Sequence, residues 1–232
     1  MSWGRSLMRM LMKQARVVAV EPVSESFRLI TLESPEFKGI QWVAGQKVQI
    51  AMGSAFVART FTPIEWDAAA GRTRILGYAH GHGPGSAWVR DVSPGDACDV
   101  FGPRASLDVG EARMPVVIGD ETSIGLACAL GGPRRPATLP CLFEVKAAAS
   151  VREVIARLHL DAAELFECKE NDAHLEDIQQ RLAALAATGS AFVLTGKAST
   201  IQHLRRALKD AGVASSRVLT KAYWAPGKTG LD

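Results

Sequence analysis

The feature that most constrains the fold of this 232-residue chain is a change in its hydrophobic pattern near residues 110–114. Before it, short apolar segments, some with the period-two alternation of Val48 and Ile50, are separated by glycine and proline. This pattern predicts an antiparallel β-barrel. Strands are expected at 16–20, 27–32, 47–51, 57–61, 74–78 and 97–101. One helix is expected in this half, beginning near Gly85–Ser86 and running through Trp88.

After the change, strand segments alternate with helical ones, which is typical of a parallel sheet covered by helices. Strands are expected at 115–119, 139–145, 164–168, 192–195 and 217–222, and helices at 122–130, 151–158, 175–185 and 200–211. Ser150 followed by Glu153 predicts a capping box, and Gly212 predicts a helix end.

The sequence therefore predicts a six-stranded antiparallel barrel over residues 1–112 and a doubly wound parallel-sheet domain over residues 113–232. Such α/β sheets bind ligands at the carboxyl ends of their strands. We therefore expect functional residues at the barrel edges and after the first strands of the second half.

Charge and composition exclude several classes of function. Lysine and arginine number 27 and aspartate and glutamate 24, and a net charge of +3 favours neither a nucleic-acid nor a membrane surface. Arg5 and Arg9 interrupt the methionine-rich N-terminus, which predicts neither a signal peptide nor a membrane span. The four cysteines form no CxxC pair, and we interpret them as reduced core residues of a cytoplasmic protein; they are Cys98, Cys128, Cys141 and Cys168.

The first segment with candidate ligand-binding residues is Arg59-Thr60-Phe61-Thr62, at the end of a predicted strand. An arginine offers a planar set of donors to a diphosphate, an aromatic side chain can cover a flat ring, and a threonine can hydrogen-bond a ring nitrogen. Taken alone, an exposed arginine beside a half-buried strand is the simpler interpretation.

The second segment is a glycine-rich loop that runs from His80-Gly81 to Gly85-Ser86-Ala87 and Trp88. Amides at the start of the following helix would point N–H donors and a helix dipole at an anion. A plain turn and a phosphate-binding turn both remain open. His80 and His82 lack the further ligands that a zinc site needs, so we expect no metal.

The third segment is Gly119-Asp120-Glu121-Thr122, directly after the first strand of the second half. Asp120 or Thr122 could simply cap a helix, but the position at a strand end favours a ligand site as well. The chain has neither a GxGxxG fingerprint nor a P-loop, so neither a standard Rossmann site nor an ATPase is supported.

In this order the segments resemble the siderophore-interacting protein family, a branch of the ferredoxin-reductase-like flavoproteins, over nearly the whole chain. That family carries an R-x-[YF]-T strand, an HG…GP-small-small-W loop, a GDET turn, a GEAS-like turn and a YWxxG close to the C-terminus. The matching residues are Arg59–Thr62, His80–Gly81 with Gly83–Trp88, Gly119–Thr122, Gly196–Ser199 and Tyr223–Gly227.

The resemblance implies a flavin-dependent enzyme that takes electrons from NADPH or NADH and passes them to the iron of a ferric siderophore, releasing Fe(II) in the cytoplasm. It implies that FAD binds Arg59, Thr60, Phe61, Thr62, His80, Gly81, Gly85, Ser86, Ala87, Thr122, Trp224 and Gly227. Thr62 would face the flavin N5 edge, and Asp120 and Thr122 the nicotinamide, which makes these three the candidate catalytic residues. A monomer or weak homo-oligomer is expected.

Some residues depart from the family pattern. Ile64 stands where a second arginine would fall, and Ser123-Ile124-Gly125 replaces the usual Ala-Leu-Pro. These changes keep one alternative open, a binding protein that holds flavin or ferric chelate without turnover. A reductase of an electron-transfer protein is a second alternative, which the mild net charge disfavours. Lys197 replaces an acidic residue, and with Arg205 or Arg206 it could favour the 2′-phosphate of NADPH.

Overall fold

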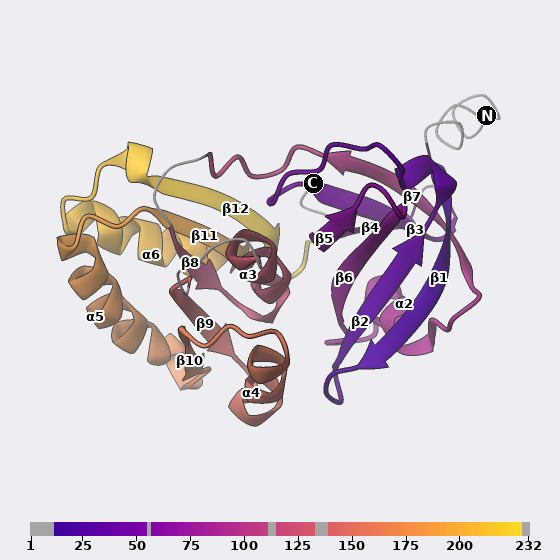
Figure 1. Cartoon of the computed structure of the whole chain (residues 1–232). Coiled ribbons are helices and arrows are strands. Elements are labelled where there is room, and N and C mark those ends of the chain that lie inside the picture. The colour runs from indigo at the N-terminus through magenta and orange to yellow at the C-terminus, as the bar shows by residue number, and fades with distance from the viewer. Residues whose placement is uncertain (1–11, 55–56, 111–114, 133–138, 229–232) are drawn as a thin grey trace. The chain divides into compact units, whose positions relative to one another are not determined.

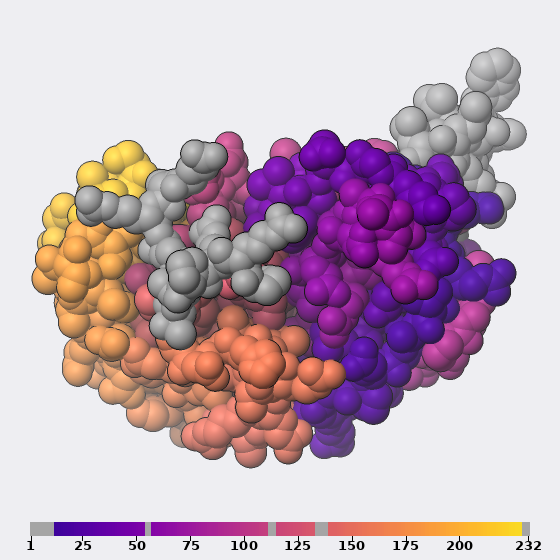
Figure 2. Space-filling view, in the orientation of Figure 1, coloured from indigo at the N-terminus to yellow at the C-terminus, as the bar shows by residue number. Residues whose placement is uncertain are grey.

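The computed structural model describes residues 12–54, 57–110, 115–132 and 139–228. The chain divides into two compact units, Met1–Asp108 and Val109–Asp232 (Figure 1). The predicted boundary between residues 112 and 113 falls among residues 111–114, which lie outside the described part. Figure 2 shows that, on the face in view, side chains fill the gaps that the ribbons leave within each unit.

The first unit is built on an antiparallel sheet of seven strands in the order β4-β3-β7-β1-β2-β6-β5. The strands are β1 (Lys13–Pro22), β2 (Phe27–Glu33), β3 (Lys47–Ser54), β4 (Val57–Phe61), β5 (Pro63–Asp67), β6 (Arg72–Tyr78) and β7 (Ala97–Arg104). All six predicted strands are present. The sheet curls so that β4 also lies against β6, which gives a half-barrel. The prediction of six strands was one short, because β5 pairs with β6 although it begins at Pro63 and carries two acidic residues.

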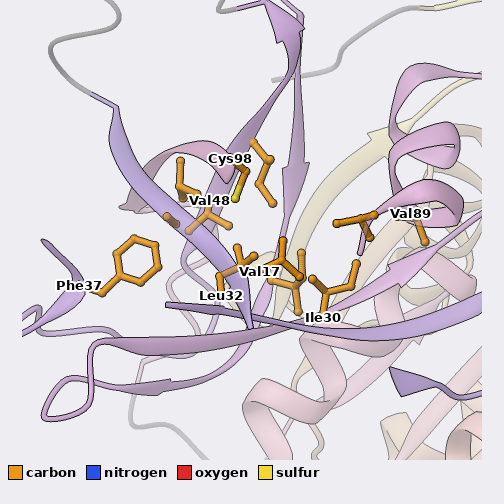
Figure 3. Close-up of a cluster of buried hydrophobic side chains, with 12 residues drawn as sticks. Val17, Ile30, Leu32, Phe37, Val48, Val89 and Cys98 are labelled. Carbon is orange, nitrogen blue, oxygen red and sulfur yellow. The ribbon is translucent and has the colours of Figure 1, made fainter. Parts of the chain in front are cut away.

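One apolar cluster holds this half-barrel together (Figure 3). Val17, Ile30 and Val48 come from three different strands, and each is fully buried. Phe37 reaches the same cluster from the short 3-10 helix η1 (Pro35–Phe37). Burial of each such side chain stabilises the fold by about 1.5–3 kcal/mol relative to its exposure. The sheet is therefore a firm support for the residues at its edges.

The helix α2 (Pro84–Asp91) packs onto this sheet where Gly77 leaves room for it. A Cβ atom at Gly77 would lie 2.8 Å from Val89 Cγ2, so no larger residue fits without movement. Arg28 secures the other end of the helix, because its Nε donates to Val89 O at 2.8 Å. The N-terminus of α2 is thereby fixed relative to β4 and β6.

The second unit contains a parallel five-stranded sheet in the order β10-β9-β8-β11-β12. The strands are β8 (Val116–Gly119), β9 (Cys141–Val145), β10 (Ala163–Glu167), β11 (Phe192–Lys197) and β12 (Val218–Trp224). The order reverses between β8 and β11, which is the switch point where doubly wound sheets bind ligands. The predicted fold class is confirmed.

Four helices cover the two faces of this sheet (Figure 1). α3 (Ile124–Gly131) and α4 (Ala148–Arg157) lie on one face, and α5 (His174–Ala187) and α6 (Ala198–Asp210) on the other. The short 3-10 helices of this unit are η2 (Glu121–Ser123), η3 (Glu170–Asp172) and η4 (Ser215–Arg217). None of the described helices combines the length and apolar character needed to span a bilayer.

Two predictions of local structure had different outcomes. Gly212 follows α6 at φ +76, and its N–H donates to Lys209 O at 2.9 Å, so the predicted helix end is confirmed. The predicted capping box was wrong, because α4 begins at Ala148 and its N-cap is Ala147, which places Ser150 inside the helix.

The prediction that all four cysteines are core residues was wrong in part. Cys98 and Cys141 are buried, but Cys128 is only partly buried and Cys168 is exposed, and all four are free thiols. Cys168 directly follows β10 at a strand end, where a period-two pattern no longer indicates which side chains face the core.

Candidate functional site

The N-terminus of α2 is the strongest candidate anion site in the half-barrel. Its N-cap is Gly83, which has no side chain to accept hydrogen bonds from the first turn, and Pro84 occupies the first helical position. The N–H of Ala87 donates to Gly83 O at 3.0 Å, so Gly85 and Ser86 present the first N–H groups of the helix. Unpaired N–H groups and the helix dipole together favour a phosphate at such an end.

Arg59 on β4 lies directly against this helix end. A Cβ atom at Gly85 would be 3.0 Å from Arg59 Cγ, so the arginine stem packs where only a glycine leaves space. One guanidinium nitrogen, Nη1, donates to Ala58 O at 2.8 Å and fixes the side chain to its own strand. The structure thus brings the first two predicted segments together.

The loop that precedes α2 is held in place by two hydrogen bonds. His80 N–H donates to Ser86 Oγ at 3.2 Å, and Arg90 Nη1 donates to Gly81 O at 2.8 Å. Ser86 is 6% exposed, and its hydroxyl is engaged inside the protein by the hydrogen bond from His80. The His80 ring stacks on Tyr78, with ring centroids 5.1 Å apart.

The remaining predicted residues of this unit lie close by. Phe61 ends β4, and its ring centroid is 5.5 Å from that of Trp88 on α2. Thr60 is exposed, and Thr62 is half-buried in the connection between β4 and β5. A cavity of about 480 Å³ is lined by residues of β1, β2, β3 and β7, among them Gln14 and Asp99, and none of the predicted site residues lines it.

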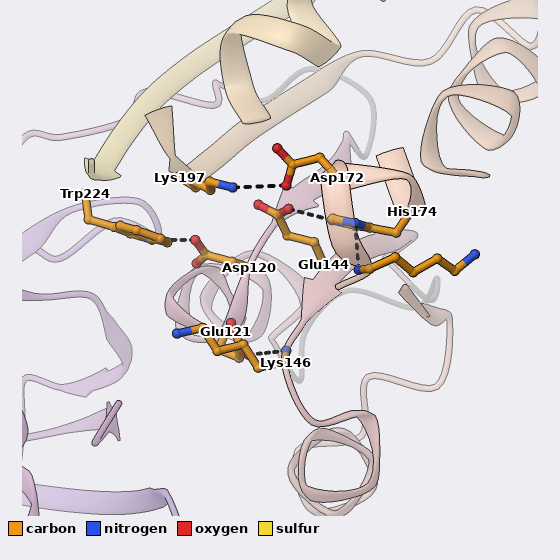
Figure 4. Close-up of polar contacts among 9 residues, drawn as sticks. Asp120, Glu121, Glu144, Lys146, Asp172, His174, Lys197 and Trp224 are labelled. Atoms are coloured by element: carbon orange, nitrogen blue, oxygen red, sulfur yellow. Dashed lines mark hydrogen bonds and ion pairs between the residues drawn. The ribbon is translucent and has the colours of Figure 1, made fainter. Parts of the chain in front are cut away.

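In the α/β unit, Asp120 is the centre of the polar contacts at the carboxyl end of β8 (Figure 4). Its Oδ1 accepts hydrogen bonds from Thr122, from the N–H at 2.8 Å and from the hydroxyl, and its Oδ2 accepts from Trp224 Nε1 at 2.6 Å. Burial raises the pKa of Asp120, and these hydrogen bonds oppose the rise because they favour the carboxylate. Asp120 therefore acts as an internal acceptor that orients Thr122 and Trp224.

Two glycines at strand ends make room for this arrangement. Gly196 has φ +97, and a Cβ atom there would lie 2.5 Å from Asp120 Oδ2. A Cβ atom at Gly119 would lie 2.1 Å from Ser123 Oγ. The Thr195 hydroxyl donates to Ser123 Oγ at 2.8 Å, and both side chains are buried. Ser123, one of the departures from the family pattern, is therefore a buried link between β11 and the loop after β8.

Two more buried acids lie at the same edge of the sheet. Glu121 Oε1 accepts from Lys146 N–H at 2.7 Å, and burial raises the pKa of Glu121. Glu144 Oε2 is 3.0 Å from His174 Nε2. Lys169 N–H donates to His174 Nδ1 at 3.2 Å, so Nε2 carries the ring proton and donates to Glu144.

A cysteine thiol lies next to this pair. The possible ligand atoms of Glu144, Cys168 and His174 all lie within 4.8 Å of one another. Since both nitrogens of His174 are engaged in hydrogen bonds, a metal ion would have to displace one of them. Partial burial of the thiol raises the pKa of Cys168 to about 11, which leaves it almost entirely protonated near neutral pH.

The C-terminal residues that were predicted to bind FAD lie in the α/β unit. Trp224 ends β12 and is anchored by Asp120, and Gly227 is exposed at φ +72. Lys197 ends β11, and its Nζ is 3.4 Å from Asp172 Oδ1. Arg205 and Arg206 are exposed on α6.

Sequence reasoning missed the pair of Glu144 and His174. An acidic residue in the otherwise apolar segment of β9 was the available signal, because an unpaired charge is rarely buried.

Comparison with known proteins points in the same direction as this geometry. Residues 48–107 match the siderophore-interacting FAD-binding domain. The NADPH-dependent ferric-chelate reductase of Escherichia coli is 27% identical over 194 residues, which cover 81% of this chain and 70% of that protein. The chain is thus similar to siderophore-interacting FAD-binding proteins over residues 48–107, and to a ferric-chelate reductase over most of its length.

Solved structures show which fold the chain shares. The siderophore-interacting protein SipS from Aeromonas hydrophila superposes with a TM-score of 0.75 at 22% identity, covering 94% of this chain and 93% of that one. Phthalate dioxygenase reductase gives a TM-score of 0.75 at 13% identity, covering 94% and 70%. The fold is ferredoxin-reductase-like, a half-barrel followed by a parallel α/β unit.

The family match covers one of the two candidate sites. Arg59, Phe61, His80 and Ser86 lie inside the matched residues, whereas Asp120 and Trp224 lie beyond them. The half-barrel site therefore lies within the matched domain, whereas the α/β site is supported by its sequence motifs and its geometry.

Proposed function

We propose that this chain is a member of the siderophore-interacting family and a flavin-dependent NAD(P)H:ferric-siderophore reductase. The observation that carries the proposal is the N-terminus of α2, where Gly83 leaves the first N–H groups without a side-chain cap and Arg59 packs against Gly85. This arrangement supplies a cation and backbone donors to one anion, as a diphosphate requires.

The residues of the half-barrel suit FAD in particular. Gly85 has no Cβ, and a side chain at this position would crowd Arg59. A ligand can therefore approach the backbone closely here. Arg59 and the N–H groups of Gly85 and Ser86 would hold the diphosphate, and the loop of His80 and Gly81 would border it. Phe61 would lie against the flavin ring, and Thr62 would offer a hydrogen bond at its edge.

In the α/β unit, NADPH or NADH would bind at the carboxyl ends of β8 and β11, the switch point of the sheet. Asp120 keeps the Thr122 and Trp224 side chains in fixed positions there. We therefore assign Asp120 a positioning role rather than the direct catalytic contact that the resemblance implied. Thr122 and Trp224 would border the nucleotide.

A bound flavin supplies the chemistry that joins the two substrates, since it accepts the two electrons of a hydride and passes them on singly. The reaction demands no acid, base or nucleophile from the side chains. The protein has to bind donor and flavin, donate hydrogen bonds from fixed N–H groups, and admit a bulky ferric complex. The buried, mutually satisfied polar groups at the carboxyl edge agree with such a binding and orienting role.

The proposal is tested by turnover of the full-length protein loaded with FAD. We expect NADPH or NADH oxidation that depends on an added ferric siderophore, with Fe(II) captured by a ferrous-specific chelator. Activity with a ferredoxin but not with ferric complexes would favour the reductase of an electron-transfer protein instead. Binding of FAD without any ferric-dependent oxidation would favour the non-catalytic alternative. A protein that binds no added FAD would contradict both the flavin site and the function.

A further inference from the structure

Lys197 and Asp172 form an ion pair at the carboxyl edge of the α/β sheet (Figure 4). Lys197 ends β11 and is the N-cap of α6, and its Nζ lies 3.4 Å from Asp172 Oδ1. The side chain of Lys197 is 21% exposed and that of Asp172 is 55% exposed. The lysine is thus turned toward the protein, and the carboxylate reaches it from the solvent side.

The surroundings of Lys197 are rich in negative charge. Asp120, Glu121 and Glu144 are each 7% exposed or less, and all lie at this edge of the sheet. A pyridine nucleotide brings phosphate groups to the switch point, where these carboxylates would repel them. Lysines at this edge would offset that repulsion: Lys146 lies beside Glu121, and Lys197 ends β11.

The loop that carries Asp172 has an uncommon backbone. Asn171 has φ +54 and Asp172 has φ +56, a region in which asparagine and aspartate are enriched among residues other than glycine. Both residues belong to η3, between β10 and α5. This conformation places the Asp172 carboxylate beside the Lys197 ammonium.

We propose that Asp172 is an intramolecular competitor of the nucleotide phosphate: a phosphate group of NADPH or NADH replaces Asp172 at Lys197. The inference rests on the proposed function. An ion pair whose carboxylate is more than half exposed holds its partners weakly, whereas a phosphate offers more acceptor oxygens and forms strong charge-assisted bonds. The exchange therefore favours the nucleotide, while Asp172 lowers its apparent affinity.

The test measures the Kd of NADP+ and NAD+ for the FAD-loaded full-length protein by calorimetry. Asp172→Asn keeps the side-chain shape and tolerates the positive φ. We expect it to tighten binding about two- to five-fold, the range that loss of an exposed competing pair allows. Lys197→Ala should weaken binding about ten-fold or more, because a charged hydrogen bond is lost. The double variant should bind as Lys197→Ala does, since Asp172 acts only through Lys197.

Glu164→Gln is the matched control, because it removes one exposed negative charge, paired with Arg181 at 2.7 Å, from the same unit. It should leave both Kd values unchanged at 0.15 M salt, where the Debye length is about 8 Å. Tighter binding of NADP+ alone would assign the contact to the 2′-phosphate, and equal tightening of NADP+ and NAD+ to the diphosphate.

Nucleotide binding that is unchanged in Asp172→Asn, or that tightens equally in the double variant and in Asp172→Asn, would overturn the inference. If the wild-type protein binds neither nucleotide while it binds FAD, the proposed donor site fails instead.

Discussion

The two candidate sites differ in how their polar groups are satisfied. At the N-terminus of α2, Gly83 leaves backbone donors without a side-chain cap, and Arg59 lies beside them. At the carboxyl edge of the α/β sheet, the buried carboxylates of Asp120, Glu121 and Glu144 each already accept hydrogen bonds from nearby groups.

This difference teaches that the two units should respond differently to mutation. In the half-barrel, the first turn of α2 has no side-chain cap, so we expect changes there to affect ligand affinity more than stability. The carboxyl edge of the second unit joins its own strand ends together, so changes there should affect stability first. A ligand at that edge must join or displace contacts that exist without it.

The largest effect on stability is expected for Gly196→Ala. The positive φ of Gly196 costs about 1–2 kcal/mol for any other residue, and crowding against Asp120 costs about 1–3 kcal/mol more. Urea unfolding of the full-length protein should show a total loss of about 2–5 kcal/mol. Gly212→Ala is the control, because φ is +76 there but nothing lies within 4 Å of its Cβ. Equal losses in the two variants would show that Asp120 imposes no constraint on β11.

The next effect concerns affinity in the half-barrel. Arg59→Ala should weaken FAD binding by about 1.5–3 kcal/mol, roughly ten- to 150-fold, because a charged hydrogen bond to the diphosphate is lost. Arg72→Ala serves as the control, since Arg72 is exposed on the same sheet and pairs with Glu33. FAD titration by fluorescence measures both variants. An affinity unchanged by Arg59→Ala would remove this residue from the cofactor site.

A pH-dependent effect is expected for Trp224→Phe, which removes the indole N–H from Asp120. Burial raises the pKa of Asp120, so the folded state takes up a proton more readily than the unfolded chain, and stability from this group falls as pH rises. The indole favours the carboxylate form and limits that fall. Its loss should therefore cost about 1.5–3 kcal/mol near pH 8 and less on acidification.

Trp66→Phe provides the comparison from the half-barrel. The Trp66 Nε1–H donates to the uncharged Phe37 O at 3.3 Å, so the cost of this variant should not depend on the charge of an acceptor. Urea unfolding at several pH values measures both variants. A cost for Trp224→Phe that is as constant with pH as that of Trp66→Phe would contradict the role assigned to Asp120.

Hydrophobic periodicity was enough to predict most of the fold. Short apolar segments between turn residues, some with period-two alternation, indicated the six predicted strands of the first unit, and the alternation of strands and helices indicated the second unit. β5 was missed because Pro63, Glu65 and Asp67 are typical of turns, and only its pairing with β6 makes it a strand. The start of α4 was misplaced because the sequence offered Ser150 as a cap, whereas the helix forms from Ala148 without one.

The sequence predicted the separate segments of the candidate sites but not the contacts between distant residues. Local motifs identified Arg59, Gly85 and Asp120, because strand ends and glycine-rich turns leave a signal over a few residues. The contact between Trp224 and Asp120 joins residues 104 positions apart, and no local pattern records it. The same holds for the pairing of Lys197 with Asp172, which depends on how β11 and the loop after β10 come together.

The most direct measurement of the central claim compares FAD with riboflavin, which has the same ring system but no phosphate. If Arg59 and the first turn of α2 hold the diphosphate, the wild-type protein binds FAD far more tightly than riboflavin, and Arg59→Ala narrows that difference by about ten-fold or more. Equal affinities for the two flavins would contradict the claim that this part of the half-barrel binds the diphosphate. So would a loss of affinity in Arg59→Ala that is the same for FAD and riboflavin.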